Sequence, residues 1–178
     1  MKFFFLLVIF YSGEVLSQSN VYNISIETID GKTIQLSDFK GKKIVVATFS
    51  PDRLKYGGLS YLDSLQIEYP SVTILIVPAG DFGGQNDSLI ITDIIKNISS
   101  LNVTIGAECA VKKDKGSRQH PLLKWLTTAA SNVHFDNDVE TDEQLFIISE
   151  SGILYAVLVN EISGNIIKNV LSQPDIKQ

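Results

Sequence analysis

The chain has 178 residues, 44% hydrophobic and 20% charged, a balance typical of one folded domain rather than a disordered chain. Its 15 basic and 20 acidic residues give a net charge of −5, which argues against nucleic acid as a partner because phosphate contacts need clustered Lys and Arg. The single cysteine, Cys109, excludes an internal disulfide, a zinc site of several cysteines and a two-cysteine redox cycle within one chain.

The N-terminus has the pattern of an export signal. A positive residue, Lys2, precedes the apolar run FFFLLVIFY, which is too short to span a bilayer as a helix. Val15 and Ser17 fit the −3 and −1 positions of a cleavage site, so residues 1–17 are predicted to be a signal peptide and 18–178 a single mature domain. The alternative is an N-terminal strand or buried helix. No other apolar stretch approaches membrane-spanning length, which predicts an exported protein, periplasmic or secreted, without a membrane span after cleavage.

The first half of the mature chain alternates strand and helix patterns. Alternation of apolar and polar residues around an Asp-Gly turn predicts a hairpin, and near-continuous apolar runs predict strands that are covered on both faces. Leucines at helical spacing predict an amphipathic helix between two such strands. The predicted elements are a hairpin over 21–29 and 33–36, a strand over 44–49, a helix over 57–69 and a strand over 72–77 that is stopped by Pro78.

The second half repeats these signals with longer irregular stretches. Isoleucines at helical spacing predict a helix at each end of this half, and two apolar runs around Glu150-Ser151-Gly152 predict a hairpin. The elements are a helix over 88–98, a helix from about His120, strands over 145–148 and 153–159, and a closing helix over 162–170, with 99–119 largely unassigned and 130–143 an acidic loop.

The order of elements defines a fold class. A β-α-β half with parallel strands, followed by a β-β-α half, is the layout of the thioredoxin fold. The prediction is an α/β protein with a central mixed β-sheet flanked by helices and an N-terminal β-hairpin. The fold alone does not give a function.

Three strings resemble one enzyme family. PAGDFGGQ at 78–85 is similar to the P-x-N-Q-F-G-G-Q segment of the glutathione peroxidases, and HPLLKWL at 120–126 resembles their H-P-L-Y-K-W-L helix. IDGKTIQLSDF at 29–39, followed by Lys-Gly-Lys, resembles their opening D-G-x-x-x-x-L-x-x-Y/F-K-G-K. The resemblance runs from about Val21 to Leu171 and implies a thioredoxin-like fold and a glutathione- or thioredoxin-dependent peroxidase activity.

The resemblance also implies a particular chemistry. In that family a cysteine or selenocysteine, at the end of the first central strand, attacks a peroxide oxygen as the thiolate or selenolate. Glutamine, tryptophan and asparagine side chains hydrogen-bond the sulfur or selenium. The sulfenic acid that forms is reduced by a resolving cysteine or an external thiol.

The nucleophile position holds a serine in this chain. Tyr56 and Gly58-Leu59 match the family's spacing without a gap, and the nucleophile then falls on Ser50. The nearest counterpart of the resolving cysteine is Ser99. Because a serine hydroxyl is much less acidic than a thiol and forms no sulfenic acid, peroxide reduction through Ser50 is excluded.

Only one of the four carried-over catalytic positions keeps its residue. The family's glutamine is present as Gln85, which could equally be a structural part of the Gly-Gly turn. Ungapped counting places Thr141 at the tryptophan position and Asp142 at the asparagine position. The sequence therefore predicts a member without peroxidase turnover, a pseudoenzyme without metal or cofactor. It would act as a binding or scaffold module for an unidentified protein or small molecule, at the former active-site cleft and the basic loop Lys112–Arg118.

A working peroxidase is the alternative function. It would reduce hydroperoxides through Cys109, with an external thiol as reductant, in an oxidative-stress response. It requires Cys109 near Gln85 in positive surroundings, for which Lys112 and Lys113 are the only hint. A partly buried, inert thiol is the competing interpretation of Cys109.

Other candidates have simpler interpretations. His120 before a proline is expected to begin a helix, and Trp125 shares a helix face with leucines and is expected in the core. Two histidines far apart in sequence make a poor metal site. A hydrolase triad of Ser50, His134 and an aspartate (Asp136, Asp138 or Asp142) is conceivable but has no nucleophile-elbow motif.

Overall fold

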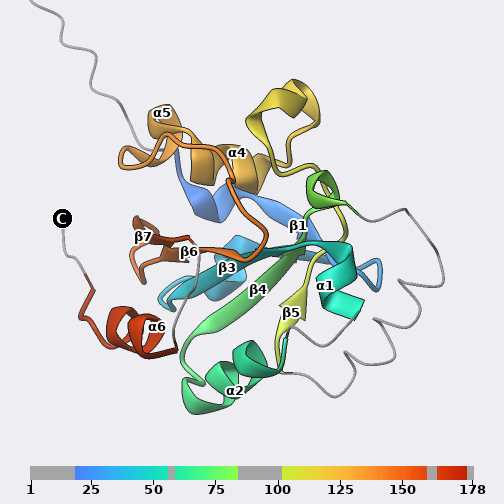
Figure 1. Ribbon diagram of the computed structural model, residues 1–178. Helices are drawn as coiled ribbons and strands as arrows, with labels where there is room; N and C mark the ends of the chain where they lie inside the picture. The colour runs from blue at the N-terminus through green and yellow to red at the C-terminus, as the bar shows by residue number, and fades with distance from the viewer. Residues whose placement is uncertain (1–18, 56–58, 84–101, 160–163, 176–178) are drawn as a thin grey trace, which may run out of the picture.

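A computed structural model describes residues 19–175 except for 56–58, 84–101 and 160–163. Its centre is a five-stranded sheet of order β5-β4-β3-β6-β7, and a separate two-stranded sheet stands at the N-terminus (Figure 1). The strands are β1 (Ser25–Glu27), β2 (Thr33–Gln35), β3 (Ile44–Phe49), β4 (Thr73–Pro78), β5 (Thr104–Ile105), β6 (Gln144–Ile148) and β7 (Leu154–Leu158).

The central sheet is mixed. Strands β3, β4 and β5 run parallel, whereas β6 is antiparallel to β3 and β7 is antiparallel to β6. The described α-helices are α1 (Pro51–Lys55), α2 (Ser60–Glu68), α4 (Pro121–Thr127), α5 (Ala129–Asn132) and α6 (Gly164–Leu171). Figure 1 shows α4 and α5 on one side of the sheet and α2 and α6 on the other. These observations confirm the predicted thioredoxin-like α/β class.

The strands are buried because both faces of the sheet are covered. All six residues of β3 are buried, as its continuous apolar sequence predicts. Alternate side chains enter two cores: Val46 and Phe146 pack under α4, while Val45 packs with Leu62 and Ile167 under α2 and α6. The closing helix thus covers the same face as α2.

The N-terminal hairpin is present but shorter than predicted. Ile26 of β1 faces Ile34 of β2 in an antiparallel pair. The beginning of the predicted first strand is instead a 3₁₀ turn over Val21–Asn23, because the side chain of Asn20 accepts a hydrogen bond from the Tyr22 amide and caps that turn.

Two predictions about helices differ from the structure. The helix predicted over 57–69 is α2, and a separate helix, α1, precedes it. Helix α1 has only five residues, too few to show a hydrophobic period, so it was recognisable only from Ser50-Pro51, a cap followed by proline at the first helical position. The short helix α5 lies at the start of the predicted acidic loop, and the helix predicted over 88–98 lies outside the described residues.

Strand β4 includes Pro78 as its last residue, one position beyond the predicted end. Among the described residues, no helix combines the length and the apolar composition needed to cross a membrane. The predicted signal peptide lies outside these residues.

Candidate functional site

The register of β3 and β6 brings Ser50 and Asp142 together. Thr48 faces Gln144 in this antiparallel pair, so continuing the pairing by two residues places position 50 opposite position 142. The Ser50 amide donates a hydrogen bond to Oδ1 of Asp142 at 2.6 Å, and the Ser50 hydroxyl donates to Oδ2 at 2.9 Å. One carboxylate therefore holds both donors of the residue at the nucleophile position.

Ser50 also caps helix α1. Its Oγ accepts a hydrogen bond from the Arg53 amide at 3.3 Å, and its carbonyl accepts from the Leu54 amide at 3.2 Å. Pro51 occupies the first helical position, where a missing N–H costs nothing. Every polar atom of Ser50 thus has a hydrogen-bond partner, and its side chain is the N-cap of α1.

An ion pair joins α1 to the chain just before β6. Arg53 pairs with Glu143, and its guanidinium lies 6.0 Å from the centre of the Phe49 ring. The Glu143 backbone is left-handed, with φ of 72°, and its amide donates to the Thr48 carbonyl at 2.8 Å. We call Ser50, Arg53, Asp142 and Glu143 the Ser50 edge.

Charge at the Ser50 edge is predominantly negative. Two carboxylates face one guanidinium there, and Tyr61 of α2 lies close to Glu143. Burial, followed by the nearby Glu143 carboxylate, holds the pKa of the Tyr61 hydroxyl well above its usual range. A reactive thiolate needs positive neighbours, so these surroundings are the opposite of what a peroxidatic cysteine requires.

The other two predicted catalytic positions are Thr141 and Gln85. Thr141 is half-buried beside Asp142, and its hydroxyl has no hydrogen-bond partner among the described residues. Gln85 and Ser99 lie outside those residues. Two of the four predicted site positions, Ser50 and Asp142, are therefore in direct contact.

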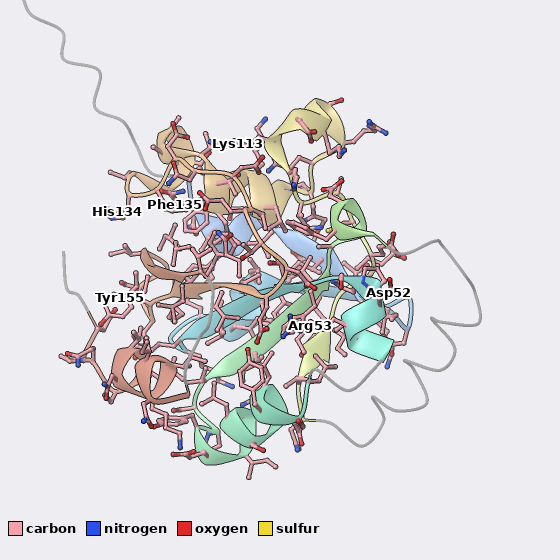
Figure 2. The ribbon with its side chains drawn as sticks, viewed as in Figure 1. Asp52, Arg53, Lys113, His134, Phe135 and Tyr155 are labelled. Carbon is pink, nitrogen blue, oxygen red and sulfur yellow. The ribbon has the colours of Figure 1, made fainter. Side chains whose placement is uncertain are left out.

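No histidine completes a hydrolase triad with Ser50. Asp142 does accept a hydrogen bond from the Ser50 hydroxyl, but His134 is exposed, and Figure 2 shows it across the molecule from Arg53, the neighbour of Ser50 in α1. The triad hypothesis is therefore wrong, since His134 does not lie beside the serine to take its proton.

Cys109 lies in negative surroundings at the end of β4. Its amide donates to the Pro78 carbonyl at 3.1 Å, and its carbonyl accepts from the Gly80 amide at 3.1 Å. Burial, together with the carboxylates of Asp81 and Glu108, raises the pKa of the Cys109 thiol to about 12. The positive environment that the alternative function required is not formed.

The Cys109 thiol is expected to react slowly with alkylating reagents. A pKa of about 12 leaves a thiolate fraction at pH 8 about a thousandfold below that of a free cysteine. Iodoacetamide labelling, followed by intact mass against pH, measures this directly, with denatured protein as the control. Labelling of the native protein at the rate of the denatured protein would contradict the structure.

Two lysines of the basic loop pair with acids. Residues Lys113–Arg118 form a 3₁₀ segment in which Lys113 pairs with Asp136 at 2.8 Å and Lys115 with Asp81 at 3.5 Å. Asp81 also accepts hydrogen bonds from the amides of Val111 and Lys112, at 2.5 and 2.9 Å. The loop is thereby fastened to the segment that follows β4.

His120 and Trp125 have the structural roles that their sequence context predicts. The His120 ring accepts a hydrogen bond from the Leu122 amide at 3.2 Å and caps α4. Trp125 is 3% exposed, and its indole N–H donates to the Ser19 carbonyl at 2.7 Å. Within the described part of the chain, no group of three or more His, Cys, Asp or Glu side chains is arranged to hold a metal ion.

Sequence reasoning missed Arg53, Glu143 and Tyr61. The contact of Arg53 with Ser50 was detectable in principle. A serine that caps a helix accepts a hydrogen bond from the amide three residues later, and that residue is Arg53. Glu143 was not detectable, since its contact with Arg53 depends on a left-handed backbone that glutamate rarely adopts.

The fold and the element order define a thioredoxin-like protein, and solved glutathione peroxidases and thioredoxin-family proteins superpose on it. The crystal structure of T. cruzi GPX1 does so with a TM-score of 0.62 at 19% identity, covering 86% of this chain and 94% of that one. No protein-family model matches the chain.

Two proteins of known family are similar to this chain in sequence. The chain is 26% identical over 141 residues to the probable mitochondrial glutathione peroxidase 3 of Arabidopsis thaliana, covering 76% of this chain and 66% of that protein. It is 25% identical over 137 residues to the glutathione peroxidase homolog BsaA of Staphylococcus epidermidis, covering 75% of this chain and 84% of that protein. The chain thus has the thioredoxin-like fold and is similar in sequence to glutathione peroxidases.

Proposed function

We propose that this protein is an exported, glutathione-peroxidase-like pseudoenzyme that binds a partner at the Ser50 edge and does not turn over peroxide. The partner class is an unidentified protein or a small molecule. The proposal rests on the serine at the nucleophile position and on the contacts that this serine makes.

The bidentate contact between Ser50 and Asp142 carries the proposal. A peroxidatic centre needs a thiolate that is free to attack, whereas the hydroxyl of Ser50 donates to a carboxylate and accepts from a helix amide. Oxygen at this position has no sulfenic state through which turnover could pass. The position supports structure and recognition instead of redox chemistry.

Export is supported by the leader-like N-terminus, in which Lys2 precedes a short apolar run. Ser19 is two residues beyond the predicted cleavage point, and its amide already donates to the Ser131 carbonyl at 3.0 Å. Cleavage after Ser17 would remove the apolar segment and leave Ser19, with its contact to Ser131, in the mature chain.

The test is peroxide consumption by the purified protein, with glutathione or thioredoxin as reductant. We expect no consumption above that of a Cys109→Ser variant, because the remaining thiol is buried and its pKa is raised to about 12. Hydrogen peroxide and an organic hydroperoxide are both assayed, at neutral pH. Reductant oxidation is followed continuously.

The matched Cys109→Ser variant separates the two functions. Turnover that is present in the parent protein and lost in this variant would overturn the proposal and establish a thiol-dependent peroxidase that acts through Cys109. Turnover that survives the variant would place the chemistry elsewhere and also contradict the proposal.

A further inference from the structure

A cavity of about 260 Å³ lies at the end of the sheet remote from Ser50. The chain enters β3 at this end and leaves β6 there, whereas Ser50 follows the opposite end of β3. The residues that line the cavity come from three separate segments and are Asn20, Tyr22, Lys40, Ser151 and Gly152. None of them belongs to the Ser50 edge.

Tyr22 provides the aromatic wall of the cavity. Its side chain is 8% exposed, and its hydroxyl donates to the Glu150 carbonyl at 2.9 Å. A Cβ atom at Gly152 would lie 2.7 Å from Cε2 of Tyr22, and Gly152 has a φ of 85°. Glycine is therefore needed here for two reasons, the close approach of the ring and the left-handed backbone.

Two hydrogen-bond donors border this cavity. Nζ of Lys40 lies 6.0 Å from the centre of the Tyr22 ring, and Lys40 has no carboxylate partner among the described residues. The Asn20 side chain accepts from the Tyr22 amide through Oδ1 at 3.0 Å, which leaves its NH₂ group available to donate. An ammonium group and an amide together form the donor set that an oxyanion accepts from.

Two carboxylates near Tyr22, those of Glu150 and Asp175, each contact another residue through one oxygen. Glu150 pairs with the buried Lys43 at 3.4 Å, and Asp175 accepts from the Ser151 hydroxyl at 3.2 Å. Lys43 in turn donates to the Leu171 carbonyl at 3.0 Å. Lys43 is therefore paired with Glu150, and Lys40 is the lysine that lines the cavity.

We propose that this cavity binds a small oxyanion, a phosphate or carboxylate group, between Lys40 and Asn20 beside the Tyr22 ring. The volume lies below the range of about 300–1,000 Å³ of sites for drug-sized ligands, so the occupant is a small ion or the anionic end of a small molecule. The site is independent of the Ser50 edge and of the function proposed for that edge.

The test is an NMR titration of the protein with inorganic phosphate at low ionic strength, where surface charges are least screened. We expect saturable shifts of the Tyr22, Ser151 and Gly152 amide signals. Lys40→Gln should weaken the apparent affinity about tenfold, because a charge-assisted hydrogen bond is lost. Asp175→Asn should tighten binding severalfold by removing a nearby negative charge.

Lys124→Gln is the matched control, since Lys124 is an exposed lysine of α4 that does not line the cavity. It should leave the affinity unchanged. A parallel titration with acetate distinguishes the two ligand chemistries: shifts of the same signals assign a carboxylate, and shifts with phosphate alone assign a phosphate group. The absence of saturable shifts with both anions, or equal phosphate affinity in the parent and Lys40→Gln, would overturn the proposal.

Discussion

A cysteine placed at the nucleophile position by Ser50→Cys is expected to react with hydrogen peroxide no faster than a free cysteine. The Asp142 carboxylate contacts this position directly, and a neighbouring negative charge disfavours the thiolate. Ser50 is 7% exposed, so burial raises the pKa of the new thiol further above the free value of about 8.5. Arg53 cannot offset this effect, because it is paired with Glu143.

The measurement is the second-order rate constant for peroxide in the Ser50→Cys, Cys109→Ser double variant, which contains one thiol. Addition of Asp142→Asn provides the matched comparison. Removal of this charge should lower the thiol pKa by about one unit and increase the rate at neutral pH about tenfold. Rapid, saturable turnover without Asp142→Asn would show that the catalytic positions have been misassigned.

These expectations rest on the contact between Ser50 and Asp142. The sequence identified both positions but did not show that they touch. Counting without gaps placed Ser50 and Asp142 at the nucleophile and asparagine positions. The structure adds that the two positions face each other across the β3–β6 pair. Strand order and register depend on contacts between distant segments, so a sequence read in chain order could not supply the distance between them.

Two kinds of feature were not predicted: elements too short to show a periodic pattern, and contacts that depend on a distant strand. Helix α1 and strand β5 have five and two residues, too short for any periodic signal. The ion pair between Arg53 and Glu143 depends on the left-handed backbone of Glu143, which the Thr48 carbonyl holds in place from another strand. By contrast, strands β3 and β6 were predicted correctly. Every residue of these strands is buried, so their sequences are almost continuously apolar.

A second left-handed residue shows how one side chain can fix a turn. Val133 follows α5 with φ of 72° and is 45% exposed, an unfavourable conformation for a β-branched residue. The fully buried Asn132 holds the turn. Its Nδ2 donates to the carbonyls of Trp125, Leu126 and Phe135 at 2.8 to 3.1 Å, and its Oδ1 accepts from the amides of His134 and Phe135 at 2.8 and 2.7 Å.

Asn132→Ala is therefore expected to destabilise the protein by about 3–5 kcal/mol, because several buried backbone groups lose their partner together. Urea unfolding at equilibrium, followed by the fluorescence of Trp125, measures the loss. Val133→Gly in the same turn should have the opposite sign and stabilise the protein by up to about 1 kcal/mol, since glycine adopts positive φ without strain. If Asn132→Ala cost under about 1 kcal/mol, the five hydrogen bonds would not be what holds Val133 in its strained conformation.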